Sequence, residues 1–227
     1  MVGMPPRVVL FDLDGTLTES APGIVNSIAH ALDAVGAPPL TKDVLLRFIG
    51  PPLIGSLRDI AGLDDGQLDA ALFAYRDYFT RQGMFENSVY DGIPALLQAL
   101  VDDGRRLAVT TAKPLSAAAP IVEHFQLARF FNAVCGPATD GEHETKAAVI
   151  VDALAQLEVE PSADVVLVGD RGHDVDAARA VGITCVGALW GYGSRDELSR
   201  ADEVVANVYE LAMLLGVSPS VGEEARA

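Results

Sequence analysis

Apolar residues follow two patterns that alternate along most of this chain. Short, nearly continuous apolar runs predict buried strands near residues 7–11, 105–111, 132–135, 164–169, 183–188 and 203–206. Apolar residues at helical spacing separate these runs and predict helices near 93–100, 118–125, 149–157 and 175–181. Strands that alternate with helices in this way predict an α/β fold, a doubly wound parallel sheet covered by helices.

Residues 17–87 break the alternation, because helical spacing is their only clear pattern and we expect no strand among them. One helix is marked by Ile24, Ile28, Leu32 and Val35, with Pro22 suited to its first turn, and a second by Leu68, Leu72, Tyr75 and Phe79. An all-helical insert directly after the first strand predicts a domain of its own. The expected organisation is therefore an α/β core at 1–16 and 88–227, a helical domain at 17–87, and a loosely ordered tail at 218–227.

Composition places the chain among soluble proteins. Hydrophobic residues make up 50% of its 227 positions, enough for a packed core. No apolar run approaches the roughly 20 residues that span a membrane, and the first six residues lack the features of a signal peptide. Cys135 and Cys185 lie in apolar, strand-like runs and are expected to be buried small hydrophobes rather than a redox pair. We expect a cytoplasmic protein with no membrane partner.

The charge balance narrows the possible partners. A formal net charge of -16 argues against nucleic acid, whose phosphate backbone would be repelled. Most of this surplus is expected to keep the surface soluble. A small phosphorylated substrate stays compatible with it, provided that the site itself supplies a cation.

Two carboxylates follow the first predicted strand. Asp12 and Asp14 are two residues apart, so an extended backbone points both the same way. They lie at the carboxyl end of the strand, where open α/β sheets bind ligands. Like charges held together need a cation or a proton between them. Taken alone, the motif is also compatible with an ordinary acidic turn after a strand.

Three further elements carry polar residues in a fixed order. Thr110 and Thr111 end the second strand of the core, Lys146 opens an amphipathic helix, and Asp170 and Asp174 follow the strand at 164–169. Carboxylate, hydroxyl, lysine and carboxylate, in that order, resemble the four-part signature of the haloacid dehalogenase superfamily. The segments 20–26, 48–53, 169–174 and 190–193 resemble its phosphoglycolate phosphatase-like branch. The resemblance covers nearly the whole chain.

This resemblance implies a Rossmann-like core with a small helical cap at 17–87, and a Mg²⁺-dependent phosphatase. Asp12 matches the nucleophile that forms an aspartyl-phosphate, and Asp14 matches the general acid and base. Dehalogenases of the superfamily usually lack this second carboxylate, so its presence favours phosphoryl transfer. Asp170 is expected to hold Mg²⁺ together with Asp12 and the backbone carbonyl of Asp14. Asp174 either binds the metal through water, orients Asp170 and Lys146, or caps its helix.

The resemblance also implies residues that bind the rest of the substrate. Thr111, two positions before Lys113, matches the phosphate-binding hydroxyl, and Ala112 would contact phosphate through its backbone N–H. Lys146 matches the lysine that anchors the phosphoryl group, with Lys113 as a less favoured alternative. In the cap, Arg47 and Gly50 are candidates for reading the leaving group, although a surface arginine is an equally open interpretation of Arg47.

Other polar and aromatic residues carry weaker expectations. His143 is expected to be a loop histidine, and His173, between Asp170 and Asp174, is expected to shape the loop there rather than bind a metal. The segment Trp190–Gly193 is open to two interpretations, a substrate or partner surface and a packed flap beside the site.

Substrate and assembly are less determined than the chemistry. A phosphoglycolate-like acid is the first expectation, and a nucleoside 5′-monophosphate or a sugar phosphate is the alternative. A phosphosugar mutase is a further rival, but no second acid–base pair is identifiable. A non-catalytic phosphate-binding regulatory protein is the alternative of another class. Monomer and homodimer are both open.

Overall fold

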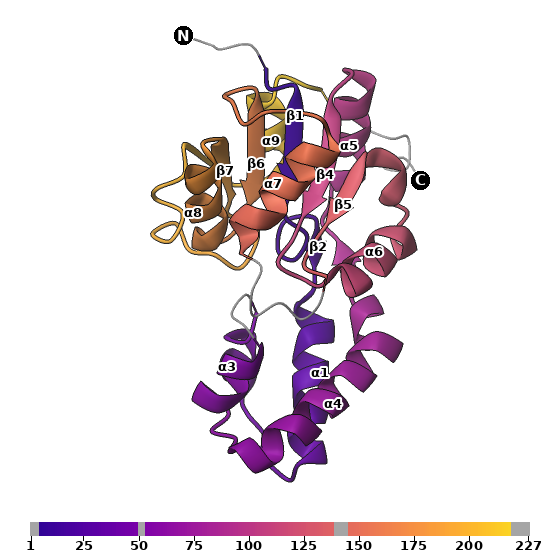
Figure 1. Ribbon diagram of the computed structural model, residues 1–227, viewed down its shortest axis with the longest axis vertical. Helices are drawn as coiled ribbons and strands as arrows, with labels where there is room; N and C mark the ends of the chain where they lie inside the picture. The colour runs from indigo at the N-terminus through magenta and orange to yellow at the C-terminus, as the bar shows by residue number, and fades with distance from the viewer. Residues whose placement is uncertain (1–4, 50–52, 139–144, 219–227) are drawn as a thin grey trace, which may run out of the picture. The chain divides into compact units, whose positions relative to one another are not determined.

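The computed structural model describes residues 5–49, 53–138 and 145–218 (Figure 1). The chain divides into two compact units, one made of residues up to 18 and from 89 onward, the other of residues 19–88. Within the described residues, none of the helices combines the length and the apolar composition that crossing a bilayer requires.

A six-stranded sheet forms the centre of the first unit. Its strands are β1 (Val8–Phe11), β4 (Arg106–Thr110), β5 (Ala133–Cys135), β6 (Val165–Gly169), β7 (Thr184–Ala188) and β8 (Glu203–Val205). They lie in the order β5-β4-β1-β6-β7-β8, and every neighbouring pair is parallel. This confirms the α/β fold with a doubly wound parallel sheet. Both cysteines are buried and free, as expected.

Helices cover this sheet because successive strand residues point to opposite faces. Val8 and Leu10 of β1 join a core with apolar residues of α7 and α8, and Figure 1 shows α7 crossing in front of the strands. Val9 and Phe11, both fully buried, alternate with them, and α5 packs against β4. The helices of this unit are α5 (Ile93–Asp102), α6 (Leu115–His124), α7 (Lys146–Gln156), α8 (Gly172–Val181) and α9 (Val208–Leu214), with the 3₁₀ turn η2 (Ala128–Phe130).

Strand β1 occupies the position that matters most for a ligand site. It pairs with β4 on one side and with β6 on the other, so the strand order changes direction at β1. Loops leaving neighbouring carboxyl ends diverge at such a point and leave room for a ligand. The residues that directly follow β1 and β6 are Asp12 and Asp170.

The second unit is helical in its described part. It contains α1 (Ala21–Ala34), α2 (Lys42–Leu46), α3 (Leu53–Asp59), α4 (Asp65–Arg81) and η1 (Gly83–Phe85). Helices α1 and α4 pack against each other, and Pro22 lies in the first turn of α1. Helix α4 is capped at its N-terminus by Asp64, whose carboxylate accepts the backbone N–H of Gln67 at 3.0 Å.

A hydrogen-bonded carboxylate ties this unit together near its end. Glu86 accepts hydrogen bonds from Asn26 at 2.8 Å, from Tyr78 at 3.0 Å and from Gln82 at 2.7 Å. The hydrogen bond from Asn26 is the largest cause that holds the pKa of Glu86 below its usual value. Residues of α1 and α4 therefore converge on one acceptor.

One expectation for residues 17–87 is wrong. Strand β2 (Thr18–Glu19) lies in this range and pairs with β3 (Ser88–Val89) in a two-stranded sheet, whereas we expected no strand among residues 17–87. Two residues are too few for an alternating pattern to be visible in the sequence. Gly50, His143 and most of the 218–227 tail lie outside the described residues.

Candidate active site

The turn after β1 sets the first part of the site. The backbone N–H of Asp12 donates to the carbonyl of Val168 at 2.9 Å, which extends the pairing with β6 past the end of β1. Gly15 then turns the chain with a φ of +86°, and a Cβ at this position would overlap the carboxylate of Asp170. The turn therefore requires glycine for its conformation and for its contact with Asp170.

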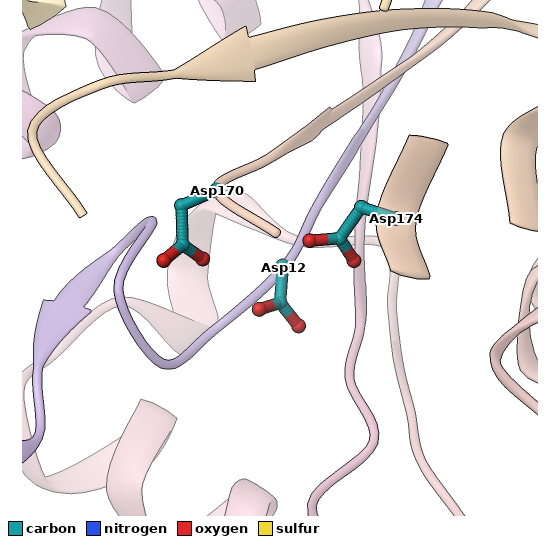
Figure 2. Close-up of side chains that lie close together, drawn as sticks. All are labelled: Asp12, Asp170 and Asp174. Carbon is teal, nitrogen blue, oxygen red and sulfur yellow. The ribbon is translucent and has the colours of Figure 1, made fainter. Parts of the chain in front are cut away.

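Three buried carboxylates converge at this edge of the sheet. Ligand oxygens from Asp12, Asp170 and Asp174 all lie within 4.8 Å of one another (Figure 2). Asp170 follows β6, and Asp174 comes from the first turn of α8. Asp12 is 5% exposed and the other two are fully buried. Residues separated by more than 150 positions thus share one small volume.

Lys146 is the cation that the structure places inside this cluster. Its Nζ forms an ion pair with Oδ1 of Asp12 and another, at 2.9 Å, with Oδ1 of Asp174. The lysine is buried at the start of α7, where the Thr145 hydroxyl accepts the backbone N–H of Ala148 at 3.2 Å. The cap at Thr145 fixes where the helix begins and therefore where Lys146 projects.

Asp174 serves two partners at once. Its Oδ2 accepts the backbone N–H of Arg171 at 3.0 Å, in the first turn of α8, while Oδ1 faces Lys146. Both the capping interpretation and the orientation of Lys146 are therefore present in the structure. Binding to a metal through water stays a prediction.

The electrostatics of the cluster follow from burial and mutual repulsion. Burial raises the pKa of Asp12, the carboxylates of Asp174 and Asp170 add to this, and Lys146 opposes it. Burial and Asp174 raise the pKa of Asp170 to about 6, against the opposing hydrogen bond from the Tyr192 backbone. Burial alone would lower the pKa of Lys146, but the charges of Asp12 and Asp174 outweigh it, so that pKa is raised.

This donor set fits a hard divalent cation. Among the three carboxylates, Asp12 and Asp174 contact the ammonium group of Lys146, so the ionised cluster carries an excess of negative charge in a buried place. All of the converging ligand atoms are oxygens, which is the donor type that Mg²⁺ prefers. A cation would offset the mutual repulsion that adds to burial in raising the pKa values of Asp12 and Asp170.

Asp14 has a different lysine as its partner. Its Oδ2 lies 3.0 Å from Nζ of Lys113, and both side chains are largely buried. Its Oδ1 is buried and has no hydrogen-bond partner among the described residues. From the sequence, Lys113 is expected only as a less favoured phosphate anchor. Its contact with Asp14 is not predictable there, because residues 14 and 113 come together only when β1 pairs with β4.

The candidate phosphate-binding residues follow β4. Thr111 is buried, and its hydroxyl accepts the backbone N–H of Lys113 at 3.1 Å. Ala112 is exposed. A Cβ on Gly136 would press against Lys113 and Thr111, so the end of β5 packs closely on this loop. Phosphate binding by Thr111 and Ala112 stays a prediction.

Two residues singled out in the sequence lie beside the cluster. Nε2 of His173 is 3.8 Å from Oδ1 of Asp174, and burial lowers the pKa of His173, so that its imidazole is neutral near pH 7. The indole N–H of Trp190 donates to the carbonyl of Thr16 at 3.1 Å. In the other unit, Arg47 directly follows α2 and is exposed.

Known proteins resemble this chain over most of its length. Residues 9–188 match the family model described as haloacid dehalogenase-like hydrolase. A solved structure of a predicted phosphatase from Clostridium acetobutylicum superposes with a TM-score of 0.84 at 41% identity, covering 92% of this chain and 97% of that one.

Three curated relatives carry different names. The tyrosine-protein kinase PtkA of Mycobacterium tuberculosis is 43% identical, over 95% of this chain and 74% of its own. A 5′-nucleotidase of Pseudomonas aeruginosa is 39% identical, over 93% of this chain and 95% of its own. Phosphoglycolate phosphatase 1 of the same organism is 30% identical, over 82% and 71%. The chain therefore belongs to the haloacid dehalogenase-like hydrolases, in their phosphatase branch.

Proposed function

We propose that this protein is a Mg²⁺-dependent phosphatase that hydrolyses small phosphorylated metabolites through an aspartyl-phosphate on Asp12. The observation that carries the proposal is the buried cluster of Asp12, Asp170 and Asp174 around Lys146, next to a second strand-end carboxylate, Asp14. A phosphate monoester is protected by its own negative charge. A cluster that gathers an ammonium group and cation ligands around one carboxylate suits attack on such an ester.

The first step transfers the phosphoryl group to the protein. A carboxylate oxygen of Asp12 forms a bond to phosphorus while the bond from phosphorus to the leaving alcohol breaks. Asp14, in its protonated form, gives its proton to the departing oxygen. Lys146, whose Nζ already contacts Asp12, offsets charge on the phosphoryl oxygens. Thr111 and the backbone N–H of Ala112 are proposed to bind other phosphoryl oxygens.

The second step releases phosphate. Water attacks phosphorus, Asp14 now accepts a proton from that water, and the bond between phosphorus and Asp12 breaks to give inorganic phosphate. The proposed Mg²⁺ ligands are Asp12, the backbone carbonyl of Asp14 and Asp170, with Asp174 acting through water. When bound, Mg²⁺ would neutralise charge on the phosphoryl group.

Two substrate classes have support. A phosphoglycolate-like acid is the first expectation from the sequence, and a nucleoside 5′-monophosphate or a sugar phosphate is the alternative. The 39% identity to a 5′-nucleotidase over 95% of its length now supports the nucleotide more strongly than the 30% identity to a phosphoglycolate phosphatase supports the acid. Fold and core residues are shared across such activities and do not decide between them.

A second candidate function is phosphoryl transfer to tyrosine, favoured by the 43% identity to PtkA. In this case the phosphoryl group would come from a nucleotide and end on a tyrosine hydroxyl instead of on water. The two functions differ in their acceptor, so the products separate them.

The test measures inorganic phosphate released from nucleoside 5′-monophosphates, 2-phosphoglycolate, sugar phosphates and p-nitrophenyl phosphate, with Mg²⁺ or after chelation. A parallel reaction with radiolabelled ATP and a tyrosine peptide measures transfer. We expect Mg²⁺-dependent phosphate release that falls by orders of magnitude in Asp12→Asn.

Three results would contradict the phosphatase. Full turnover after rigorous chelation would show that the reaction does not need a metal. A folded and active Asp12→Asn variant would show that Asp12 is not the nucleophile. Labelled peptide without phosphate release would favour the kinase.

A further inference from the structure

The segment Trp190–Gly193, which follows β7, packs on the loop that carries Asp170. The backbone N–H of Tyr192 donates to Oδ2 of Asp170 at 2.7 Å. The indole of Trp190 donates to the carbonyl of Thr16 at 3.1 Å, and the hydroxyl of Thr16 donates to Oδ1 of Asp170 at 3.3 Å. Each oxygen of the Asp170 carboxylate therefore has a donor, and this segment is connected to both.

Two glycines allow this close approach. A Cβ on Gly191 would overlap the carbonyl oxygen of Gly15 and the side chain of Asp170, and a Cβ on Gly193 would overlap the carbonyl oxygen of Asp170. The backbone of the segment thus lies directly against both the turn after β1 and the residue after β6. Any larger residue at 191 would push Asp170 or the segment away.

A residue shortly after this segment, Glu197, contacts the start of α8. Oε1 of Glu197 accepts Nε–H of Arg171 at 2.9 Å and the backbone N–H of Gly172 at 2.8 Å. Residues in the stretch 190–197 therefore form hydrogen bonds with three consecutive residues, 170 to 172. The carboxylate of Asp170 is held in one orientation before any ligand arrives.

We propose that Trp190–Gly193 is a positioning segment that presets Asp170 for binding of a divalent cation and so sets the affinity for that cation. This rests on the proposed metal site. A carboxylate with one hydrogen bond to each oxygen keeps lone pairs for a metal and loses little rotamer freedom on binding. Residues that orient metal ligands typically change affinity by about 10- to 100-fold when replaced.

Four variants isolate this role. Gly191→Ala places a methyl group against Asp170, and Trp190→Phe removes the indole donor. Thr16→Val removes the hydroxyl donor at nearly constant volume, whereas Thr16→Ser keeps it. Gly55→Ala is the matched control, because a Cβ at Gly55 meets nothing within 4 Å.

The primary measurement is the Kd of Mn²⁺ for the metal-free protein, from the spin resonance signal of free Mn²⁺, with Mg²⁺ measured by competition. We expect the Kd to rise about tenfold or more in Gly191→Ala and severalfold in Trp190→Phe and Thr16→Val. Thr16→Ser and Gly55→Ala should match the wild type. Thermal unfolding in chelator separates these changes from a general loss of stability. The Tm of the metal-free protein should differ between wild type and variant by far less than the rise in Tm that added metal produces.

The outcomes distinguish this inference from the proposed function. A wild type that binds Mn²⁺, with Kd values unchanged in Gly191→Ala, Trp190→Phe and Thr16→Val, would overturn the positioning role and leave the metal site standing. A wild type that binds no divalent cation would overturn both. If Gly191→Ala does not fold, Trp190→Phe decides, because it removes a contact of the segment itself. Unchanged Kd with an altered ranking of substrates in Trp190→Phe would show a substrate surface and overturn the proposal.

Discussion

At the scale of single residues, two lysines form ion pairs with different carboxylates of the site. Lys146 contacts Asp12 and Asp174, and Lys113 contacts Asp14. Removing one partner of a buried ion pair leaves an unpaired buried charge, which typically costs about 3–5 kcal/mol. We expect Lys146→Met to lower the free energy of unfolding of the metal-free protein by about 3 kcal/mol.

Lys113→Met is the matched control for this first prediction. Asp14 is 19% exposed at its side chain, whereas Asp174 is 0% exposed, so water compensates more of the lost contact at Asp14. Urea unfolding in chelator measures both variants. A Lys146→Met variant no less stable than Lys113→Met would contradict the burial argument.

Asp14 should matter most when the leaving alcohol is a poor one, because such a group needs a proton as it departs. Asp14→Asn is therefore expected to slow hydrolysis of alkyl phosphates by about 10²- to 10⁴-fold and to slow aryl phosphates much less. The measurement is kcat/KM across a series of leaving groups. An equal fall in kcat/KM for every substrate would show that Asp14 is not the general acid.

Sequence alone identified which residues gather here but not how they pair. Asp12, Asp170, Asp174 and Lys146 were named because, together with their places at strand and helix ends, they match the four-part signature of the haloacid dehalogenase superfamily. The choice of Asp14 as partner of Lys113 depends on side-chain directions across β1 and β4, which no periodicity encodes. The contacts of Trp190 and Tyr192 are hidden for the same reason, since a loop after β7 reaches back to residues 16 and 170.

At the scale of elements, the ends of β1 and β6 and the start of α8 place like charges together. The pKa of Asp170 is about 6 in the folded, metal-free protein against 3.8 as the ordinary value. Between these values the folded state keeps a proton that the unfolded state releases. Stability from this group is therefore present at low pH and lost as pH rises through about 6.

We expect the free energy of unfolding of the metal-free protein to rise by about 1 kcal/mol when the pH falls from 7 to 5, because folded Asp170 binds its proton more tightly than unfolded Asp170. Asp12, whose pKa is also raised, acts in the same direction. Urea unfolding in chelator at the two pH values measures the difference, and Asp170→Asn is the control that lacks the group. An identical pH difference in wild type and Asp170→Asn would contradict the raised pKa.

Element prediction was accurate where periodicity had room to appear. The strands and long helices of the first unit match the apolar runs to within a few residues. Helices α2, α3 and α9, with 5, 7 and 7 residues, went unpredicted, because one or two turns contain too few apolar positions to establish a period. The pairing of β2 with β3 was missed for the same reason.

At the scale of the whole molecule, the open question is what residues 19–88 contribute to the reaction. They form a compact helical unit of their own, and the resemblance stated from sequence implies a cap that selects substrates. Gly50, one of its two candidate residues, lies outside the described residues, so Arg47 is the one available for a test. It is exposed, as is Lys42 in the same short segment.

If Arg47 reads an anionic group on the leaving alcohol, its charge acts on substrate choice and not on the chemical step. Arg47→Ala should then raise KM by about tenfold for substrates whose leaving group carries a carboxylate, a loss of about 1.4 kcal/mol, and leave aryl phosphate hydrolysis nearly unchanged. Lys42→Ala removes the same charge from α2 and should leave all substrates alike. The measurement is kcat/KM over 2-phosphoglycolate, a nucleoside 5′-monophosphate and p-nitrophenyl phosphate for the three proteins. If Arg47→Ala ranks the substrates by kcat/KM as the wild type does, Arg47 is an ordinary surface arginine. Substrate choice would then be assigned to the catalytic core.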